Sequence, residues 1–170
     1  MTTTHGRRGT VRDWEQAAGL LAEHVRWVAE AVGLDLRDRQ PGSLPELAAP
    51  EAFYHSPDGA LVLAHVEGRP AGIVGVHRLT GDVGELKRMY VRPHARGLGV
   101  GRALVDEAVT AAEDLGFREL WLETDPVSMA GALRIYRDAG FSDIPPYGEL
   151  GLGGVVTLGR ALARSPATTP

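Results

Sequence analysis

The sequence of 170 residues contains no cysteine. Disulfide bonds, zinc sites with cysteine ligands and thiol nucleophiles are therefore excluded. No apolar run is long enough to cross a bilayer, so we expect no membrane partner. Residues 1–10 lack the apolar segment of a secretory signal, which leads us to expect a cytoplasmic protein.

An excess of basic residues is also missing. Lys and Arg together number 18 against 22 Asp and Glu, and they are spread along the chain. Proteins that bind nucleic acids usually present a basic face, so we expect no nucleic-acid partner. Hydrophobic residues make up 44% of the chain, which is enough for the core of one α/β domain.

The two ends of the chain are small, polar and contain Gly or Pro. Such segments bury little apolar surface, so we predict disordered tails over residues 1–10 and 163–170. The chain between them shows no internal repeat and no linker. Residues 11–162 are therefore expected to form a single domain.

Hydrophobic periodicity predicts a succession of helices and strands along this domain. Residues 11–32 carry an apolar helical stripe that Gly33 ends, and Asp125 followed by Pro126 is a typical helix start. The predicted helices are 11–32, 43–49, 100–115 and 126–139, and the predicted strands are 60–66, 71–79, 85–91, 118–124, 141–144 and 154–162. Ahead of the first helix only residues 10–12 fit a strand. This order predicts an α/β fold with a mixed sheet and helices on both faces.

Glycines and charges concentrate between residues 85 and 102. A predicted strand leads into the segment Arg96-Gly97-Leu98-Gly99-Val100-Gly101-Arg102, which opens a helix. Glycines let the backbone approach a phosphate closely, and the N–H groups of a helix N-terminus point at an anion there. The two arginines add formal positive charge, so the segment predicts a site for a pyrophosphate.

Two other phosphate-binding motifs compete with this interpretation. A P-loop requires Gly-x-x-x-x-Gly-Lys-Ser/Thr, and no Lys-Ser or Lys-Thr follows here. A Rossmann site requires Gly-x-Gly-x-x-Gly and a later acidic residue, for which Glu123 or Asp125 is available. Its third glycine would stand one position later than Gly101, so this alternative fits less well.

The same residues are similar to the signature of the GNAT superfamily of N-acetyltransferases. Its motif, Arg/Gln-x-x-Gly-x-Gly/Ala between the fourth strand and the third helix, is matched by Arg96, Gly99 and Gly101. A second family landmark, small-x-x-aliphatic-Tyr-x-x-x-Gly-Phe, is matched by residues 132–141. Two motifs in this order are more specific than either alone. The similarity covers residues 11–162.

The resemblance implies a mostly antiparallel, splayed central sheet that binds acetyl-CoA between its fourth and fifth strands. The backbone of residues 89–91 would pair with the pantetheine arm, and the N–H groups of residues 98–102 would hold the pyrophosphate. Met129 stands where many relatives carry an asparagine that contacts pantetheine. The cofactor-binding residues implied are Met89, Tyr90, Val91, Arg96, Gly97, Leu98, Gly99, Val100, Gly101, Arg102 and Met129.

Two side chains are candidates for the proton transfers that the resemblance implies. Tyr136 matches a tyrosine that protonates the leaving thiolate, and a phenol with a pKa of about 10 can donate at neutral pH. Its place on an apolar helical stripe is also typical of a core residue. Glu85 matches a general-base glutamate of some histone-acetylating relatives, although an ion pair with Lys87 or Arg88 would also explain a charge on a central strand.

The activity implied is transfer of an acetyl group from acetyl-CoA to a primary amine by direct attack in a ternary complex. The acceptor is expected to be a small-molecule or peptide amine, and a homodimer is expected because dimers are common among relatives. Two alternatives stay open, a non-catalytic acyl-CoA sensor and a Rossmann-like oxidoreductase. His65, His77 and His94 lack the spacing of metal ligands, so no metal is expected.

Overall fold

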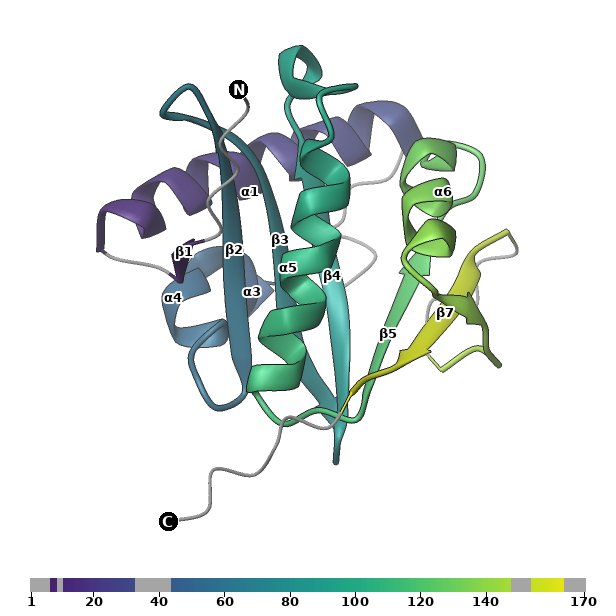
Figure 1. Cartoon of the computed structure of the whole chain (residues 1–170). Helices are drawn as coiled ribbons and strands as arrows, with labels where there is room; N and C mark the ends of the chain where they lie inside the picture. Colours follow the sequence, from purple (N-terminus) through teal and green to yellow (C-terminus); the bar gives the residue numbers. More distant parts are fainter. Residues whose placement is uncertain (1–6, 9–10, 33–43, 148–153, 164–170) are drawn as a thin grey trace.

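The computed structural model describes residues 7–8, 11–32, 44–147 and 154–163. Within these residues the chain forms one seven-stranded sheet with helices against both faces (Figure 1). The strands are β1 (Arg7–Arg8), β2 (Gly59–Val66), β3 (Arg69–Thr80), β4 (Val83–Val91), β5 (Glu119–Thr124), β6 (Ser142–Asp143) and β7 (Val156–Ala161). The helices are α1 (Val11–Val32), α3 (Leu44–Ala48), α4 (Pro50–Phe53), the 3-10 turn η2 (Pro93–Ala95), α5 (Val100–Asp114) and α6 (Ala130–Asp138).

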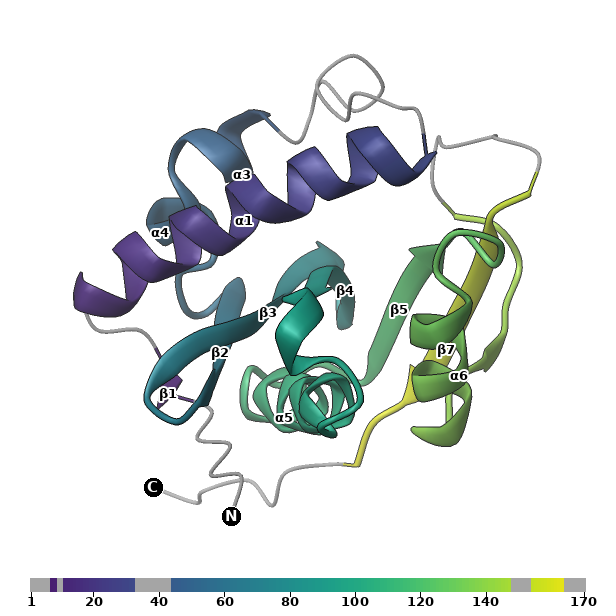
Figure 2. The same cartoon turned by 90° about the horizontal axis from the view of Figure 1, so that it is seen from above.

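The sheet has the strand order β1-β2-β3-β4-β5-β7-β6. Strands β4 and β5 run parallel, and the other neighbouring pairs are antiparallel. Figure 2 shows α1, α3 and α4 over one face of the sheet and α5 over the other. The predicted mixed, mostly antiparallel sheet with helices on both faces is thus confirmed. A Rossmann fold requires a mostly parallel sheet, so the oxidoreductase alternative does not fit this topology.

The hairpin between β2 and β3 turns through only two residues, Glu67 and Gly68, because Val66 pairs with Arg69. Both have positive φ angles, 51° and 75°. This is the backbone that a two-residue turn needs to match the right-handed twist of its strands. The strands predicted at residues 60–66 and 71–79 are therefore joined as a tight hairpin.

Strand β4 contains a bulge at Arg88. Its φ is 59°, and the register with β3 shifts between the pairs Ile73–Tyr90 and Gly75–Lys87. A bulge adds a residue to one strand, increases the local twist and redirects the side chains beyond it. In a regular strand Lys87 and Arg88 would point to opposite faces, but here both side chains contact Glu46, which lies on α3.

Strands β4 and β5 pair over only three positions. Val83 lies opposite Glu119, and the last pair joins Glu85 to Trp121. Beyond that pair the two strands diverge, as Figure 1 shows at the centre of the molecule. The second half of β4 therefore has no partner strand on its β5 side among the described strands, and its backbone groups on that edge are open to a ligand.

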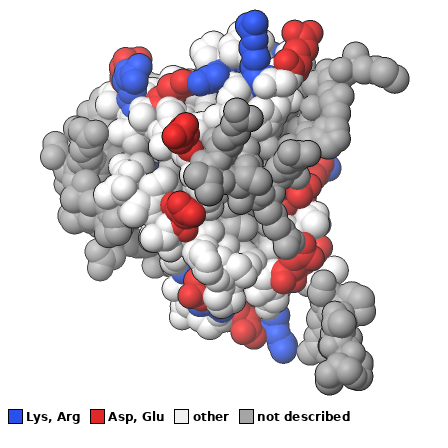
Figure 3. All heavy atoms as spheres, turned by 90° about the vertical axis from the view of Figure 1, so that its left-hand side faces the viewer, with Lys and Arg blue, Asp and Glu red and all other residues white. Residues whose placement is uncertain are grey.

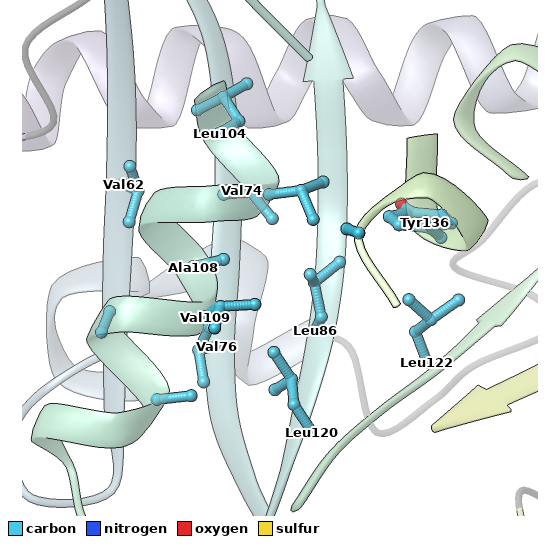
Figure 4. Packing of buried hydrophobic residues seen from close by; sticks show 14 of the residues in the cluster. Val62, Val74, Val76, Leu86, Leu104, Ala108, Val109, Leu120, Leu122 and Tyr136 are labelled. Atoms are coloured by element: carbon cyan, nitrogen blue, oxygen red, sulfur yellow. The ribbon is translucent and has the colours of Figure 1, made fainter. Parts of the chain in front are cut away.

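The main hydrophobic core lies between the sheet and α5. Val74, Val76 and Leu86 from the sheet meet Leu104 and other buried side chains of α5, and the same cluster extends to Tyr136 on α6 (Figure 4). A second cluster on the opposite face joins Leu20 of α1 to the sheet. Of the stripe predicted on residues 11–32, Ala17, Leu20, Leu21, His24 and Val28 are buried, whereas Val25 is only half-buried.

Helix α6 begins four residues later than the sequence predicts. The Asp125 side chain accepts a hydrogen bond from the N–H of Val127 at 2.8 Å, and the Asp125 carbonyl accepts one from Met129 at 3.0 Å. These local bonds hold residues 126–129 in a turn, so the helix starts only at Ala130. Gly140, with φ 86°, ends it as predicted.

The N-terminal segment also differs from expectation. Arg7 and Arg8 pair with Leu63 and Val62 of β2 as a short edge strand, within the segment that the sequence assigns to a tail. Residues 10–12 do not supply this strand, since Val11 already begins α1. Pro50 does not simply end a helix but begins α4, where it stands at the first helical position. Gly33 and Ser43 lie outside the described residues.

Charged side chains are mixed in sign on the face of the molecule at the left of Figure 1. Figure 3 shows both Lys or Arg and Asp or Glu side chains there, without a large patch of one sign. Elsewhere in the structure, Arg78 forms an ion pair with Asp58 at 2.7 Å. In the part of the chain that the structure describes, no helix combines the length and apolarity that a bilayer crossing needs.

His24 is a buried titratable residue on the side of α1 that faces the sheet. It is 5% exposed, its ring stands edge-on to Tyr90 at 6.1 Å, and its Nδ1 has no hydrogen-bond partner. Burial, aided by the nearby charge of Arg88, lowers the pKa of His24 from 6.5 to about 3. The imidazole is therefore neutral in the folded protein at every pH near neutrality.

This burial predicts a loss of stability in mild acid. Below pH 6.5 the unfolded chain takes up a proton at His24 that the folded protein does not bind until pH falls to about 3. The contribution lost is about 1.4 kcal/mol per pH unit within that window. We expect His24→Phe to reduce the drop in unfolding free energy between pH 6.5 and pH 4.5, measured by urea denaturation. His55→Asn, at an exposed histidine, is the control and should keep the full drop; equal pH profiles for the two variants would contradict the assignment.

Candidate active site

A cavity of about 460 Å³ lies where β4 and β5 diverge. One wall is the second half of β4, the glycine segment closes one end, α6 forms the opposite wall and Trp27 of α1 completes the lining. The lining residues are Trp27, Met89, Tyr90, Val91, Arg96, Gly97, Gly99, Val100, Gly101, Arg102, Ser128, Met129, Gly131, Ala132, Ile135 and Tyr136. The cavity therefore joins segments that lie far apart in the sequence.

The three glycines at the end of the cavity are required for two different reasons. Gly97 and Gly99 have φ angles of 77° and 80°, in the left-handed region that disfavours a Cβ. Gly101 lies inside α5, where an added Cβ would come within 2.9 Å of the Ile135 side chain on α6. The first two glycines thus shape the loop, and the third lets α5 and α6 approach each other.

The N-terminus of α5 opens into this cavity. Its N-cap is Gly99, no side chain caps the helix, and the first turn contains no acidic residue. The unbonded N–H groups of a helix start and the positive end of its dipole favour an anion. Two arginines flank the position, so the site is suited to a phosphate group.

The two arginines differ in how they are held. The Arg96 Nε donates to the Val91 carbonyl at 3.1 Å, and its guanidinium lies over the Trp27 ring at 5.7 Å. Arg102 is partly neutralised by Asp106, one turn later, at 2.9 Å. Arg96 therefore carries the less compensated positive charge at the cavity, and Trp27 orients it.

Tyr136 is buried on the α6 wall. It is 5% exposed, it lines the cavity, and its ring contacts Phe141 edge-on with centroids 6.0 Å apart. Burial raises the pKa of the Tyr136 hydroxyl above its ordinary value, so the phenol is protonated at neutral pH. The ring of Tyr136 thus belongs to the core, as its place on an apolar helical stripe predicts, and the residue also lines the cavity.

Glu85 stands at the last paired position of β4 before the strands diverge. Its side chain is 21% exposed, and its carboxylate forms an ion pair with Lys87 at 3.1 Å. It also accepts a hydrogen bond from the Tyr147 hydroxyl at 3.2 Å. Desolvation and the nearby carboxylates of Glu85 and Glu123 raise the pKa of Tyr147, which keeps that hydroxyl a donor. Glu85 does not belong to the cavity lining described above.

The structure gathers nearly all of the predicted cofactor-binding residues around one cavity. Leu98 is the exception, since it is 50% exposed and does not line the cavity. Trp27 was missed by the sequence reasoning, although its spacing from Leu20 and His24 places it on the same side of α1. Among the described residues no group of three or more His, Asp or Glu is arranged to hold a metal ion.

Residues 29–141 match the acetyltransferase (GNAT) family. An uncharacterised N-acetyltransferase of Schizosaccharomyces pombe is 39% identical over 104 residues, which are 60% of this chain but only 63% of that protein. The uncharacterised N-acetyltransferase YjgM of Escherichia coli is 31% identical over 127 residues, covering 73% of this chain and 75% of that protein.

A solved structure shows the same fold. It is a GNAT superfamily phosphinothricin acetyltransferase of Sinorhizobium meliloti in complex with AcCoA, with a TM-score of 0.67 and 22% sequence identity. The alignment covers 99% of this chain and 93% of that one. At this level of identity the similarity concerns the arrangement of the sheet and helices.

Proposed function

This chain belongs to the acetyltransferase (GNAT) family, and from that premise we propose that it transfers an acetyl group from acetyl-CoA to a primary amine. The amine belongs to a small molecule or a peptide. The observation that carries the proposal is the cavity where β4 and β5 diverge, with the uncapped N-terminus of α5 at one end and Tyr136 on the opposite wall.

The chemistry of the cavity suits acetyl-CoA. The pyrophosphate requires N–H donors and positive charge, which the start of α5 and Arg96 supply. The amide groups of the pantetheine arm require an unpaired strand edge, which residues 89–91 of β4 supply. Met129 lines the cavity and brings a thioether where it cannot replace the hydrogen bonds of an asparagine.

Counted from the ammonium form of the acceptor, the nitrogen loses two protons in the proposed reaction and the leaving sulfur gains one. After the first proton is removed, the neutral amine attacks the thioester carbonyl carbon, the new C–N bond forms and the C–S bond breaks. Tyr136 gives its hydroxyl proton to the sulfur that leaves, and the second proton lost by the nitrogen as the amide forms restores the phenol. Burial raises the proton affinity of a thiolate in the same way as that of the phenol, so the transfer is not opposed by the raised pKa of Tyr136.

Glu85 is proposed as the base that takes the proton of the ammonium group. It stands where the two strands diverge, half-buried, and Tyr147 orients one of its oxygens. Its ion pair with Lys87 must loosen, or a water must bridge it, before a proton reaches the carboxylate. Glu85 therefore has a second role in the resting protein, as the ion-pair partner of Lys87.

The first experiment tests cofactor binding by calorimetry with acetyl-CoA and with NAD(P). We expect acetyl-CoA alone to bind and Gly99→Asp to abolish binding, because a carboxylate at the start of α5 repels the pyrophosphate. Asp tolerates left-handed backbone better than most residues, so the variant should fold. The control Gly19→Asp adds the same charge at an exposed position of α1 and should bind normally.

Absence of acetyl-CoA binding at millimolar concentration would refute the proposed function. A thiol-release assay over a panel of amines then tests turnover. Binding without release of CoA from any amine would instead favour an acyl-CoA sensor.

Tyr136→Phe tests the acid. The substitution keeps the ring in the core and removes only the hydroxyl, so the fold and the affinity for acetyl-CoA should be nearly unchanged. We expect kcat to fall roughly 100-fold, the low end of what a positioned acid contributes. An unaltered kcat, measured by thiol release at saturating acetyl-CoA, would remove Tyr136 from the mechanism.

Glu85→Gln tests the base. It removes the charge at nearly constant volume, and we expect kcat to fall about 100-fold while calorimetry gives an unchanged affinity for acetyl-CoA. Glu119→Gln makes the same change at an exposed glutamate of β5 and should leave kcat unaltered. A Glu85→Gln protein with full kcat but lower unfolding free energy would reduce Glu85 to its ion pair with Lys87.

A further inference from the structure

A fully buried carboxylate lies on the short helix α3, outside the cavity. Glu46 is 0% exposed, and its carboxylate accepts a hydrogen bond from the Tyr54 hydroxyl. Arg88 reaches both of its oxygens, with Nε at 3.2 Å from Oε1 and a terminal nitrogen at 3.3 Å from Oε2. Lys87 approaches the same carboxylate at 3.7 Å. A buried charge is costly unless it is paired in this way, so these contacts hold α3 firmly against β4.

Arg88 is also the residue at which β4 is bulged. Its φ of 59° costs energy in any residue with a Cβ, and its guanidinium is held by the fork-like contact with Glu46. Arg88 is 7% exposed, so both partners of this ion pair are removed from water. The side-chain contact therefore stabilises a backbone conformation that the residue would not adopt by preference.

The bulge lies directly before the part of β4 that lines the cavity. Met89, Tyr90 and Val91 follow Arg88 and form the strand wall of the cavity. Without the bulge, the register with β3 would continue unshifted and each of these residues would move by one position. The side chains that now face the cavity would then point toward the hydrophobic cluster of α1, and those that now face that cluster would point toward the cavity.

We propose that Glu46 is a positioning residue for the acyl-CoA cavity, acting through Arg88 to hold the bulge that sets the free edge of β4. Glu46 itself touches neither the cavity nor the reacting groups. This role of Glu46 in ligand binding rests on the proposed function, which identifies acyl-CoA as the ligand of the β4 edge. The dependence of the bulge on Glu46 does not rest on that function.

The test separates the bulge from a general loss of stability. Glu46→Gln removes the carboxylate charge at constant size, and we expect the dissociation constant for CoA, measured by calorimetry, to rise about tenfold, the scale of one left-handed backbone penalty. Adding Arg88→Gly should restore affinity to within about threefold, because glycine adopts a positive φ without any side-chain support. Adding Arg88→Ala should not, since it also removes the guanidinium but keeps the Cβ.

Two further measurements complete the comparison. Asp82→Asn breaks an ion pair with Arg118 whose side chains are 64% exposed, and this control should bind CoA as the unaltered chain does. Circular dichroism and a single unfolding transition show which variants are folded. If the Glu46→Gln proteins do not fold, the single variants Arg88→Gly and Arg88→Ala carry the same comparison.

Amide resonances of Met89 and Tyr90, assigned by NMR, follow the strand without any ligand. We expect Glu46→Gln to shift these resonances. Adding Arg88→Gly to that variant should return them to their original positions, whereas adding Arg88→Ala should leave them shifted. Equal behaviour of the glycine and alanine variants, or normal CoA affinity in Glu46→Gln, would overturn the proposal. If the unaltered chain bound no CoA, the proposed function would fail, and these resonances would still decide whether Glu46 holds the bulge.

Discussion

The short pairing of β4 with β5 is the constraint on which the site depends. The two strands are joined only from Val83–Glu119 to Glu85–Trp121, and then they separate. The backbone groups of β4 beyond Glu85 have no strand partner on this side among the described residues, and a ligand with amide groups of its own can provide partners. The same separation makes room for a cavity between β4 and α6, and it leaves Glu85 at the point of divergence.

The glycine segment combines three physical requirements in a few residues. Left-handed backbone at Gly97 and Gly99 turns the chain into α5, and the missing Cβ of Gly101 allows α6 to come close. The helix start that results has no side-chain cap and faces the cavity. The guanidinium of Arg96 is held at this end by a contact from outside the segment, because it lies over the ring of Trp27 on α1. The positive potential at this end thus depends on packing between elements as well as on the loop.

The charged residues of the central strand β4 are explained by their contacts on the face of the sheet that α3 covers. Glu46 and Glu85 together balance the charges of Lys87 and Arg88 there, and Glu85 continues the series of contacts to Tyr147. Tyr147 in turn packs against Trp121 of β5, with centroids 5.2 Å apart. The network therefore connects α3, β4 and the β5 side of the molecule next to the point where the strands separate. Its members balance charge beside the point where β4 and β5 stop pairing.

The sequence by itself determined the order of the main helices and strands from α1 onward, the sheet type and the loop that ends the cavity, because periodicity, turn residues and glycine spacing act over a few neighbouring residues. It missed β1 and α4, and it misplaced the start of α6, where a local bond to Asp125 delays the helix. Only the tertiary structure decided the bulge, the burial of Glu46 and the place of Trp27 at the cavity. Each of these depends on contacts between residues distant in the chain, whose energies no local pattern records.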